Sequence, residues 1–213
     1  MSRCRSLPPE RICFIVHQIK IKYVTLQCNS KDSRQGRLMK ELVHNREISV
    51  QTFDLGNHSI LVRGSLIDRQ HRPWSNEVRK RPKIVHDMVI QIKVKGPEML
   101  IEQAEATMPY HPREECLVVL PWIRNLEGLR ITQGFSLKVK KAIGGTKGCA
   151  HLTSLLTAMG PSAVQGYWAA YGVEEEKVTL HMEAVRNILN TCYLWREDGP
   201  LVKGLRKMDN DKK

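Results

Sequence analysis

Alternating apolar and polar positions predict four β-strands in the first half of the chain. Two runs rich in β-branched residues, at 48–55 and 59–68, are separated by Gly56-Asn57-His58, whose composition is typical of a hairpin turn. Residues 89–95 alternate strictly, and residues 99–108 alternate in part, so that they could form the partner strand. A mostly antiparallel sheet of about four strands is the simplest interpretation.

After residue 110 the apolar positions follow the period of helices. Leucines and isoleucines at a spacing of three predict a helix over residues 114–126. A second helix is predicted over residues 135–143, with Thr132 as its N-cap and Gly144-Gly145 at its end.

Two more helices are predicted further along. An apolar stripe over residues 152–164 indicates a helix that begins after Cys149. Three glutamates at 174–176 precede another helical run. They would lie at the N-terminus of that helix, where acidic side chains are favourable. The predicted fold class is therefore α+β, with a mostly antiparallel sheet of about four strands followed by three or four helices.

The net charge of +12 over 213 residues belongs mainly to the two ends of the chain. Residues 1–40 hold nine basic and two acidic residues, and residues 203–213 hold five basic and two acidic ones. We expect a basic, poorly ordered extension at 1–40, a single α+β domain at 41–202 and a basic disordered tail at 203–213. Because binding to nucleic acid needs clustered charge, the nearly neutral domain is not expected to bind it.

Cysteine usage and hydropathy favour a cytoplasmic protein with free thiols. Six unevenly spaced cysteines are too few for a disulfide-dense secreted scaffold. The apolar run at 12–16 is shorter than a signal-peptide core of about 7–15 residues, and no run approaches the roughly 20 residues needed to cross a bilayer. We expect no membrane association, and a protein partner remains open.

The stretch AIGGTKGCAHLTSLL, residues 142–156, holds the arrangement best suited to chemistry. Cys149 is predicted at a helix N-terminus beside Lys147, where the helix dipole and the cation would stabilise its thiolate. His151 is a candidate base or ligand, but it converges with Cys149 only if Cys149 is still in the turn. The alternative is that Cys149 packs as a small apolar side chain.

Further candidate ligands are spread along the chain. Cys116 begins the first predicted helix and Cys192 follows the last one, so three thiols and His151 would form a soft-metal or sulfur-handling site if the helix ends met. His86-Asp87 opens a strand, where a carboxylate could orient an imidazole. The candidate metal ligands are Cys116, Cys149, His151, Asp87, His86 and Cys192, the candidate catalytic residues are Cys149 and His151, and the candidate cofactors are zinc and an iron-sulfur species.

Five stretches, taken in order, resemble one known family. They are IVHDM, Pro-Tyr followed by Cys116, NLEGLRITQGF, GGTKGCAHLTSLLTAMGPSAVQ and TCYLWREDGP. Over residues 44–204 the chain resembles the bacterial domain of unknown function family 2889, whose hallmark is a Gly-Cys-Thr-His-Leu box. Ala150 stands where that family usually has Thr. The resemblance implies a bacterial cytoplasmic protein and implies no activity.

The order of the predicted elements is also similar to that of NifU-like iron-sulfur cluster scaffold proteins. In those proteins three cysteines and an acidic or histidine partner hold zinc or a nascent cluster. The similarity implies Cys116 as the first thiol and Cys149 as the last, with Asp87 or His151 as the extra ligand. Cys192 would take the place of the middle cysteine.

Three functions follow as hypotheses. The first is a Cys/His metal-binding or sulfur-carrying site at the GCAHL turn, residues 148–152. The second is a non-catalytic structural or interaction module. The third is an acyl or sulfur transferase with Cys149 as nucleophile and His151 or His86 as base.

Deleting residues 1–40 should leave the melting temperature of the remaining chain unchanged, because this segment is predicted to lie outside the folded domain. Thermal unfolding of the full and shortened chains, followed by circular dichroism, measures the effect. A large loss of stability on deletion would show that the segment contributes a strand to the sheet.

Overall fold

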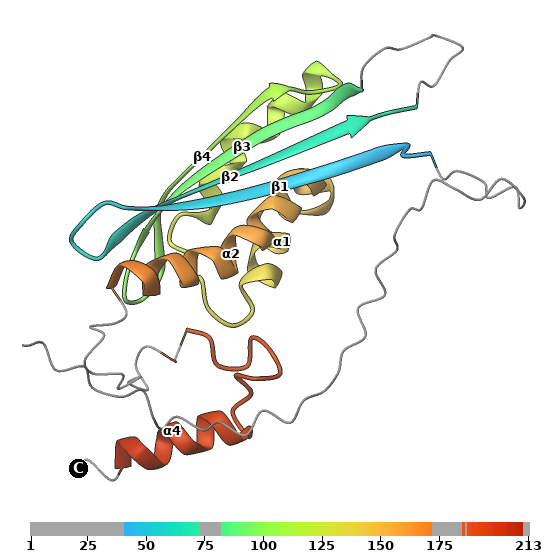
Figure 1. Cartoon of the computed structure of the whole chain (residues 1–213). Coiled ribbons are helices and arrows are strands. Elements are labelled where there is room, and N and C mark those ends of the chain that lie inside the picture. The colour runs from blue at the N-terminus through green and yellow to red at the C-terminus, as the bar shows by residue number, and fades with distance from the viewer. Residues whose placement is uncertain (1–40, 73–81, 172–184, 186, 211–213) are drawn as a thin grey trace, which may run out of the picture. The chain divides into compact units, whose positions relative to one another are not determined.

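The computed structural model describes residues 41–72, 82–171, 185 and 187–210. Four strands form one sheet in the order β1-β2-β3-β4, and each pair of neighbours is antiparallel (Figure 1). The strands are β1 (His44–Asp54), β2 (Ser59–Gln70), β3 (Lys83–Lys95) and β4 (Leu100–Tyr110). The predicted α+β fold class and the four-stranded antiparallel sheet are confirmed.

The register of β2 and β3 lines up their apolar side chains on one face. Val62 lies opposite Ile92 and Leu66 lies opposite Met88, and all four side chains are buried. Because successive side chains of a strand point to opposite faces, every second residue continues this inward row. Two positions beyond Leu66, the row reaches Asp68.

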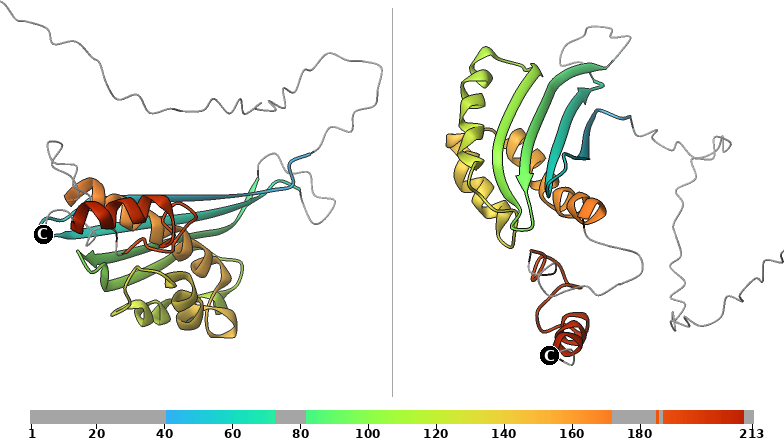
Figure 2. Two further views of the ribbon diagram at one scale, coloured as in Figure 1. Left: turned by 90° about the horizontal axis from the view of Figure 1, so that it is seen from below. Right: turned by 90° about the vertical axis from the view of Figure 1, so that its left-hand side faces the viewer.

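Helices follow the sheet, and α1 and α2 lie on the same face of it (Figures 1 and 2). The long helix α2 contacts β1, β2 and β3. Its leucines Leu152, Leu155 and Leu156 are buried, which explains why this face of the sheet is apolar. The helices of the described chain are η1 (Glu114–Leu126), α1 (Phe135–Ile143), η2 (Gly145–Lys147), α2 (Ala150–Tyr171) and α4 (Pro200–Asn210).

Two details of the predicted helices differ from the structure. The segment η1 is a 3-10 helix with Pro121 inside it, where a proline removes a backbone donor. Thr132 is not the N-cap of α1, because the capping position is Gly134 in a left-handed conformation, with φ of 78° and no side-chain cap. The Thr132 carbonyl instead accepts a hydrogen bond from the Phe135 amide at 2.9 Å.

The C-terminal part also differs from the expectation of disorder from residue 203. Helix α4 begins with Pro200, a residue suited to the first turn of a helix, and Val202 is fully buried. The helix predicted after the glutamates at 174–176 lies mostly outside the described residues. The predicted extension at 1–40 and residues 211–213 lie outside them as well.

The turn between α1 and α2 is closed on the last carbonyl of α1. The Cys149 amide donates to the Ile143 carbonyl at 3.2 Å, and the Thr153 hydroxyl donates to the same carbonyl at 3.2 Å and to that of Cys149 at 2.8 Å. A Cβ atom on Gly148 would lie 1.7 Å from the Ile143 oxygen. Only glycine therefore lets the chain pass here, and this passage sets where α2 begins.

Gly148→Ala should destabilise the protein by roughly 1–3 kcal/mol, because the added methyl group meets backbone that has to move. Urea unfolding measures the effect. Gly204→Ala is the matched control, since its Cβ would meet no atom within 4 Å and alanine favours a helix interior. An equal response of the two variants would show that the close approach at Gly148 does not determine the turn.

Candidate metal centre

A row of three polar side chains crosses the sheet at the end of its apolar face. In the register, Arg46 of β1 lies opposite Asp68 of β2, and Asp68 lies opposite His86 of β3. Arg46 donates from Nε to Asp68 Oδ1 at 2.7 Å and from a terminal nitrogen to Oδ2 at 2.8 Å. The His86 Nδ1 atom lies 2.9 Å from Asp68 Oδ2. Only 3% of the Asp68 side chain is exposed, so the carboxylate is buried, and its charge is paired with Arg46.

The beginning of α2 adds His151 to this row. Its Nε2 atom lies 3.6 Å from Asp68 Oδ2, and its ring lies 3.9 Å from the His86 ring, centroid to centroid. One donor atom each from Asp68, His86 and His151 lies within 4.8 Å of the other two. Three elements that are distant in sequence therefore bring two imidazoles and one carboxylate together.

Cys149 lies on the other side of the His151 ring. Its sulfur is 3.7 Å from Nδ1 of His151, whereas Nε2 faces Asp68. Cys149 directly precedes α2, which begins at Ala150, so it still lies in the turn. This is the condition under which Cys149 and His151 can come together. The structure places the imidazole between the thiol and the carboxylate.

The surroundings set the protonation states of this cluster. Burial opposes ionisation of Asp68, but the hydrogen bonds and charge of Arg46, together with His86 and His151, outweigh it and lower the Asp68 pKa below its ordinary 3.8. The pKa of His151 is lowered from 6.5, first by burial and then by the charges of His86 and Arg46, against the opposing pull of Asp68. At neutral pH Asp68 is ionised and His151 is neutral, which are the states a metal ion requires.

The cluster lines a pocket of about 540 Å³. Its rim is accessible, since 48% of the His44 side chain and 36% of the Arg46 side chain are exposed. The His44 Nε2 atom also lies 3.6 Å from Asp68 Oδ1. The pocket is lined by Val43, His44, Arg46, Asp68, Gln70, Arg72, Val85, His86 and His151.

Other candidates from the sequence lie elsewhere. Asp87 neighbours His86 on β3 and so points to the opposite face of the sheet. Cys116 is half-buried in η1, where it packs against the core. Within the described chain, neither residue joins the group formed by Asp68, His86 and His151.

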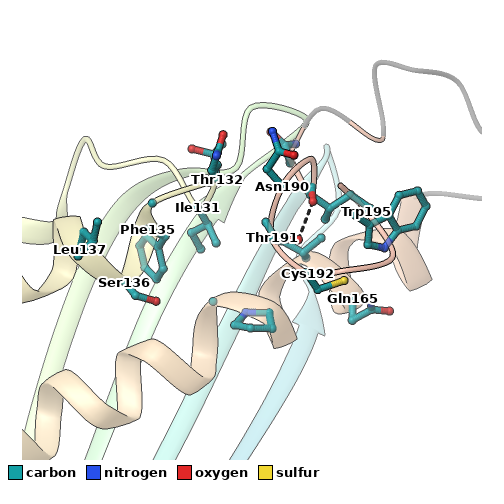
Figure 3. A pocket seen from close by; sticks show the side chains of 17 residues that line it. Ile131, Thr132, Phe135, Ser136, Leu137, Gln165, Asn190, Thr191, Cys192 and Trp195 are labelled. Atoms are coloured by element: carbon teal, nitrogen blue, oxygen red, sulfur yellow. Dashed lines mark hydrogen bonds between the residues drawn. The ribbon is translucent and has the colours of Figure 1, made fainter. Parts of the chain in front are cut away.

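Cys192 is exposed and lines a different pocket, of about 520 Å³. Figure 3 shows it in the loop that also carries Thr191 and Trp195. Phe135 and Leu137 of α1 contribute to the lining of the same pocket. The described residues therefore do not bring Cys192 into the group with His86 and His151.

Asp68 and Arg46 are the members that the sequence analysis missed. A signal was present in β2, because Ile60, Val62 and Leu66 occupy every second position of a buried row and Asp68 continues it. A carboxylate in register with a buried apolar row needs a partner. Arg46 becomes that partner only through the pairing of β1 with β2.

Comparison with known proteins finds one family. The family model described as "Protein of unknown function (DUF2889)" matches residues 44–165, which is more than half of the chain. No curated protein and no solved structure matches the chain significantly. Among the described helices, none has the length and apolar character needed to span a membrane.

Asp68→Asn should destabilise the protein by roughly 1–3 kcal/mol at pH 7, because it removes the ionised acceptor that Arg46 and His86 share. The pKa of Asp68 is lowered in the folded state, so its stabilisation is present above the ordinary value of 3.8 and is lost as the pH falls through the folded-state pKa. The difference in unfolding free energy between the wild type and the variant should therefore shrink below about pH 4.

Urea unfolding at several pH values between 7 and 3 measures that difference. Asp198→Asn is the control, since 83% of the Asp198 side chain is exposed and its ion pair with Arg196 is long, at 3.6 Å. A difference for Asp68→Asn that stays constant down to pH 3 would contradict the assigned charge state.

Proposed function

We propose that Asp68, His86 and His151 bind a divalent transition-metal ion such as zinc. The chain belongs to the DUF2889 family of proteins of unknown function, and the proposal starts from that membership. The observation that carries the proposal is the convergence of one donor atom from each residue to within 4.8 Å, on the wall of an accessible pocket. The family supplies no activity, so the proposal rests on the chemistry of the site.

The donor set fits zinc better than it fits a hard cation. Imidazole nitrogens favour zinc and its transition-metal neighbours, whereas calcium and magnesium favour sites made of oxygen atoms. Two ligands at about 2.0–2.1 Å from a tetrahedral ion lie roughly 3.3–3.4 Å apart. The His151 Nε2 to Asp68 Oδ2 distance of 3.6 Å is close to that separation.

Three protein ligands beside a pocket leave a coordination position open. Structural zinc sites are closed by four protein ligands, whereas catalytic sites keep one position for water or substrate. All three proposed ligands line the pocket of about 540 Å³, which has room for such a ligand. The arrangement therefore supports a metal centre that acts on a ligand, rather than one that only holds the fold together.

The protonation states support the same proposal. Asp68 is ionised and His151 is neutral at pH 7, because their pKa values are both lowered. An ionised carboxylate only accepts hydrogen bonds, so Nδ1 of His86 carries the hydrogen in its contact with Asp68. A metal ion bound at this nitrogen would take the place of the hydrogen, which the ring would then carry on Nε2.

Cys149 acts in this proposal as a positioning residue and not as a ligand. Histidines that bind metal commonly use the second ring nitrogen to donate to a neighbouring acceptor. The Cys149 sulfur lies 3.7 Å from Nδ1 of His151 and can be that acceptor while Nε2 faces Asp68. The three proposed ligands line the pocket, whereas Cys149 is not among its described lining residues, which fits the positioning role.

Zinc should bind to the chelator-treated, untagged full chain with one ion per chain. Isothermal titration calorimetry under reducing conditions gives the affinity and the number of ions bound per chain. His86→Gln and His151→Gln should each weaken binding by at least about 100-fold, because each removes one of three ligands.

His111→Gln is the matched control. His111 is also partly buried, and its Nδ1 atom contacts the Met108 carbonyl at 3.1 Å, away from the cluster. It should bind zinc like the wild type, and circular dichroism should show that all variants are folded. Absence of zinc binding by the wild type, or equal binding by all three variants, would overturn the proposal.

A further inference from the structure

We propose that the pocket beside Asp68 binds an oxyanion of the phosphate class, held by Arg46 and Arg72. The pocket then has a defined substrate class, a small phosphate-bearing molecule. Only one contact of this ligand rests on the proposed metal centre, namely the oxygen that would take the open coordination position. The two arginine contacts stand without it.

The charges that line the pocket favour an anion. Two arginines and one carboxylate are the permanently charged residues among those that line it, and Arg46 neutralises Asp68. Arg72 therefore leaves the lining with a positive charge. Addition of a divalent cation at the histidines would make the pocket more positive still, which would attract an anion over a longer range.

Arg46 retains hydrogen-bonding capacity toward the pocket. A guanidinium has five N–H donors, and the bonds to Asp68 use one on Nε and one on a terminal nitrogen. The side chain is 36% exposed and lines the pocket, so its other donors are accessible. The bidentate contact with Asp68 holds the planar group in a fixed orientation, which lowers the entropic cost of presenting those donors.

Arg72 is the second arginine of the pocket and follows the end of β2 by two residues. Its backbone amide donates to the Val43 carbonyl at 3.4 Å, where the end of β2 meets the beginning of β1. Its side chain lines the pocket and is exposed. Arginine suits tetrahedral oxyanions because it offers several donors in one plane, and phosphate has enough oxygens to bind two arginines and a metal at once.

The remaining lining residues suit a phosphate group with a small organic substituent more than an aromatic base. His44 and Gln70 add polar side chains, and Val43 and Val85 supply the apolar part of the lining. The pocket has no Phe, Tyr or Trp among its described lining residues, so no platform for base stacking is present. A volume of about 540 Å³ accommodates a phosphate together with a small organic group.

Inorganic phosphate is the probe that tests this inference. Titration calorimetry on the full chain, in zinc-free and in zinc-loaded form without excess zinc, should show binding in both forms and tighter binding with zinc. Arg72→Gln should weaken phosphate binding by about tenfold without weakening zinc binding, because Arg72 is not one of the three metal ligands and its loss removes a positive charge from the pocket.

Arg63→Gln is the matched control, since Arg63 is an exposed arginine of β2, the strand that precedes Arg72, and does not line the pocket. It should bind phosphate like the wild type. Acetate, tested at the same concentrations, should bind at least about tenfold more weakly, because a carboxylate has too few oxygens for both arginines and the metal.

Three results would overturn the inference. They are no phosphate binding in either form, phosphate binding that Arg72→Gln and Arg63→Gln change equally, and acetate binding as tight as phosphate binding. Zinc binding without phosphate binding would refute the oxyanion site and leave the metal centre standing. Phosphate binding that depends on Arg72 in a chain unable to bind zinc would support the oxyanion site and refute the metal centre.

Discussion

The buried carboxylate of Asp68 is the group around which the pocket is built. A carboxylate with 3% of its side chain exposed is stable only when its charge and its lone pairs are satisfied. Arg46 supplies a bidentate ion pair and His86 supplies a further hydrogen bond. The same contacts that make burial tolerable hold the carboxylate oxygens in fixed positions, so the stability of this end of the sheet and the geometry of the site have one cause.

Two independent features of the fold bring the histidines to that carboxylate. The pairing of β2 with β3 places His86 directly opposite Asp68, and a slip of one residue would turn one of the two side chains to the other face. The tight turn at Gly148 sets the start of α2 and therefore the position of His151. The site thus depends on the sheet register and on one close backbone contact.

The sequence patterns predict the sheet well because a strand with one buried face alternates with a period of two, and β2 and β3 do so clearly. They predict α1 and α2 by their apolar stripes and terminal glycines. They fail at Thr132, because the choice between a side-chain cap and a left-handed glycine depends on how the chain enters the helix. The sequence patterns also fail to predict α4, because a short basic segment carries no clear helical signal.

The site was predictable only in part, for a physical reason. His86 and His151 are recognisable as candidate ligands by residue type, but their meeting depends on contacts between residues 65 positions apart. Asp87 is a candidate in the sequence because it adjoins a histidine, but neighbours in a strand point to opposite faces. Cys149 lies next to His151 in space as well as in sequence, and its thiol is on the far side of the imidazole from Asp68.

X-ray absorption at the zinc edge of the zinc-loaded chain tests the central claim most directly, because it identifies the atoms bound to the metal. The account predicts a shell of nitrogen and oxygen atoms at about 2.0–2.1 Å, with histidine scattering and no sulfur. A sulfur atom at about 2.3 Å that disappears in Cys149→Ser would contradict it, since Cys149 would then be a ligand and not the group that orients His151.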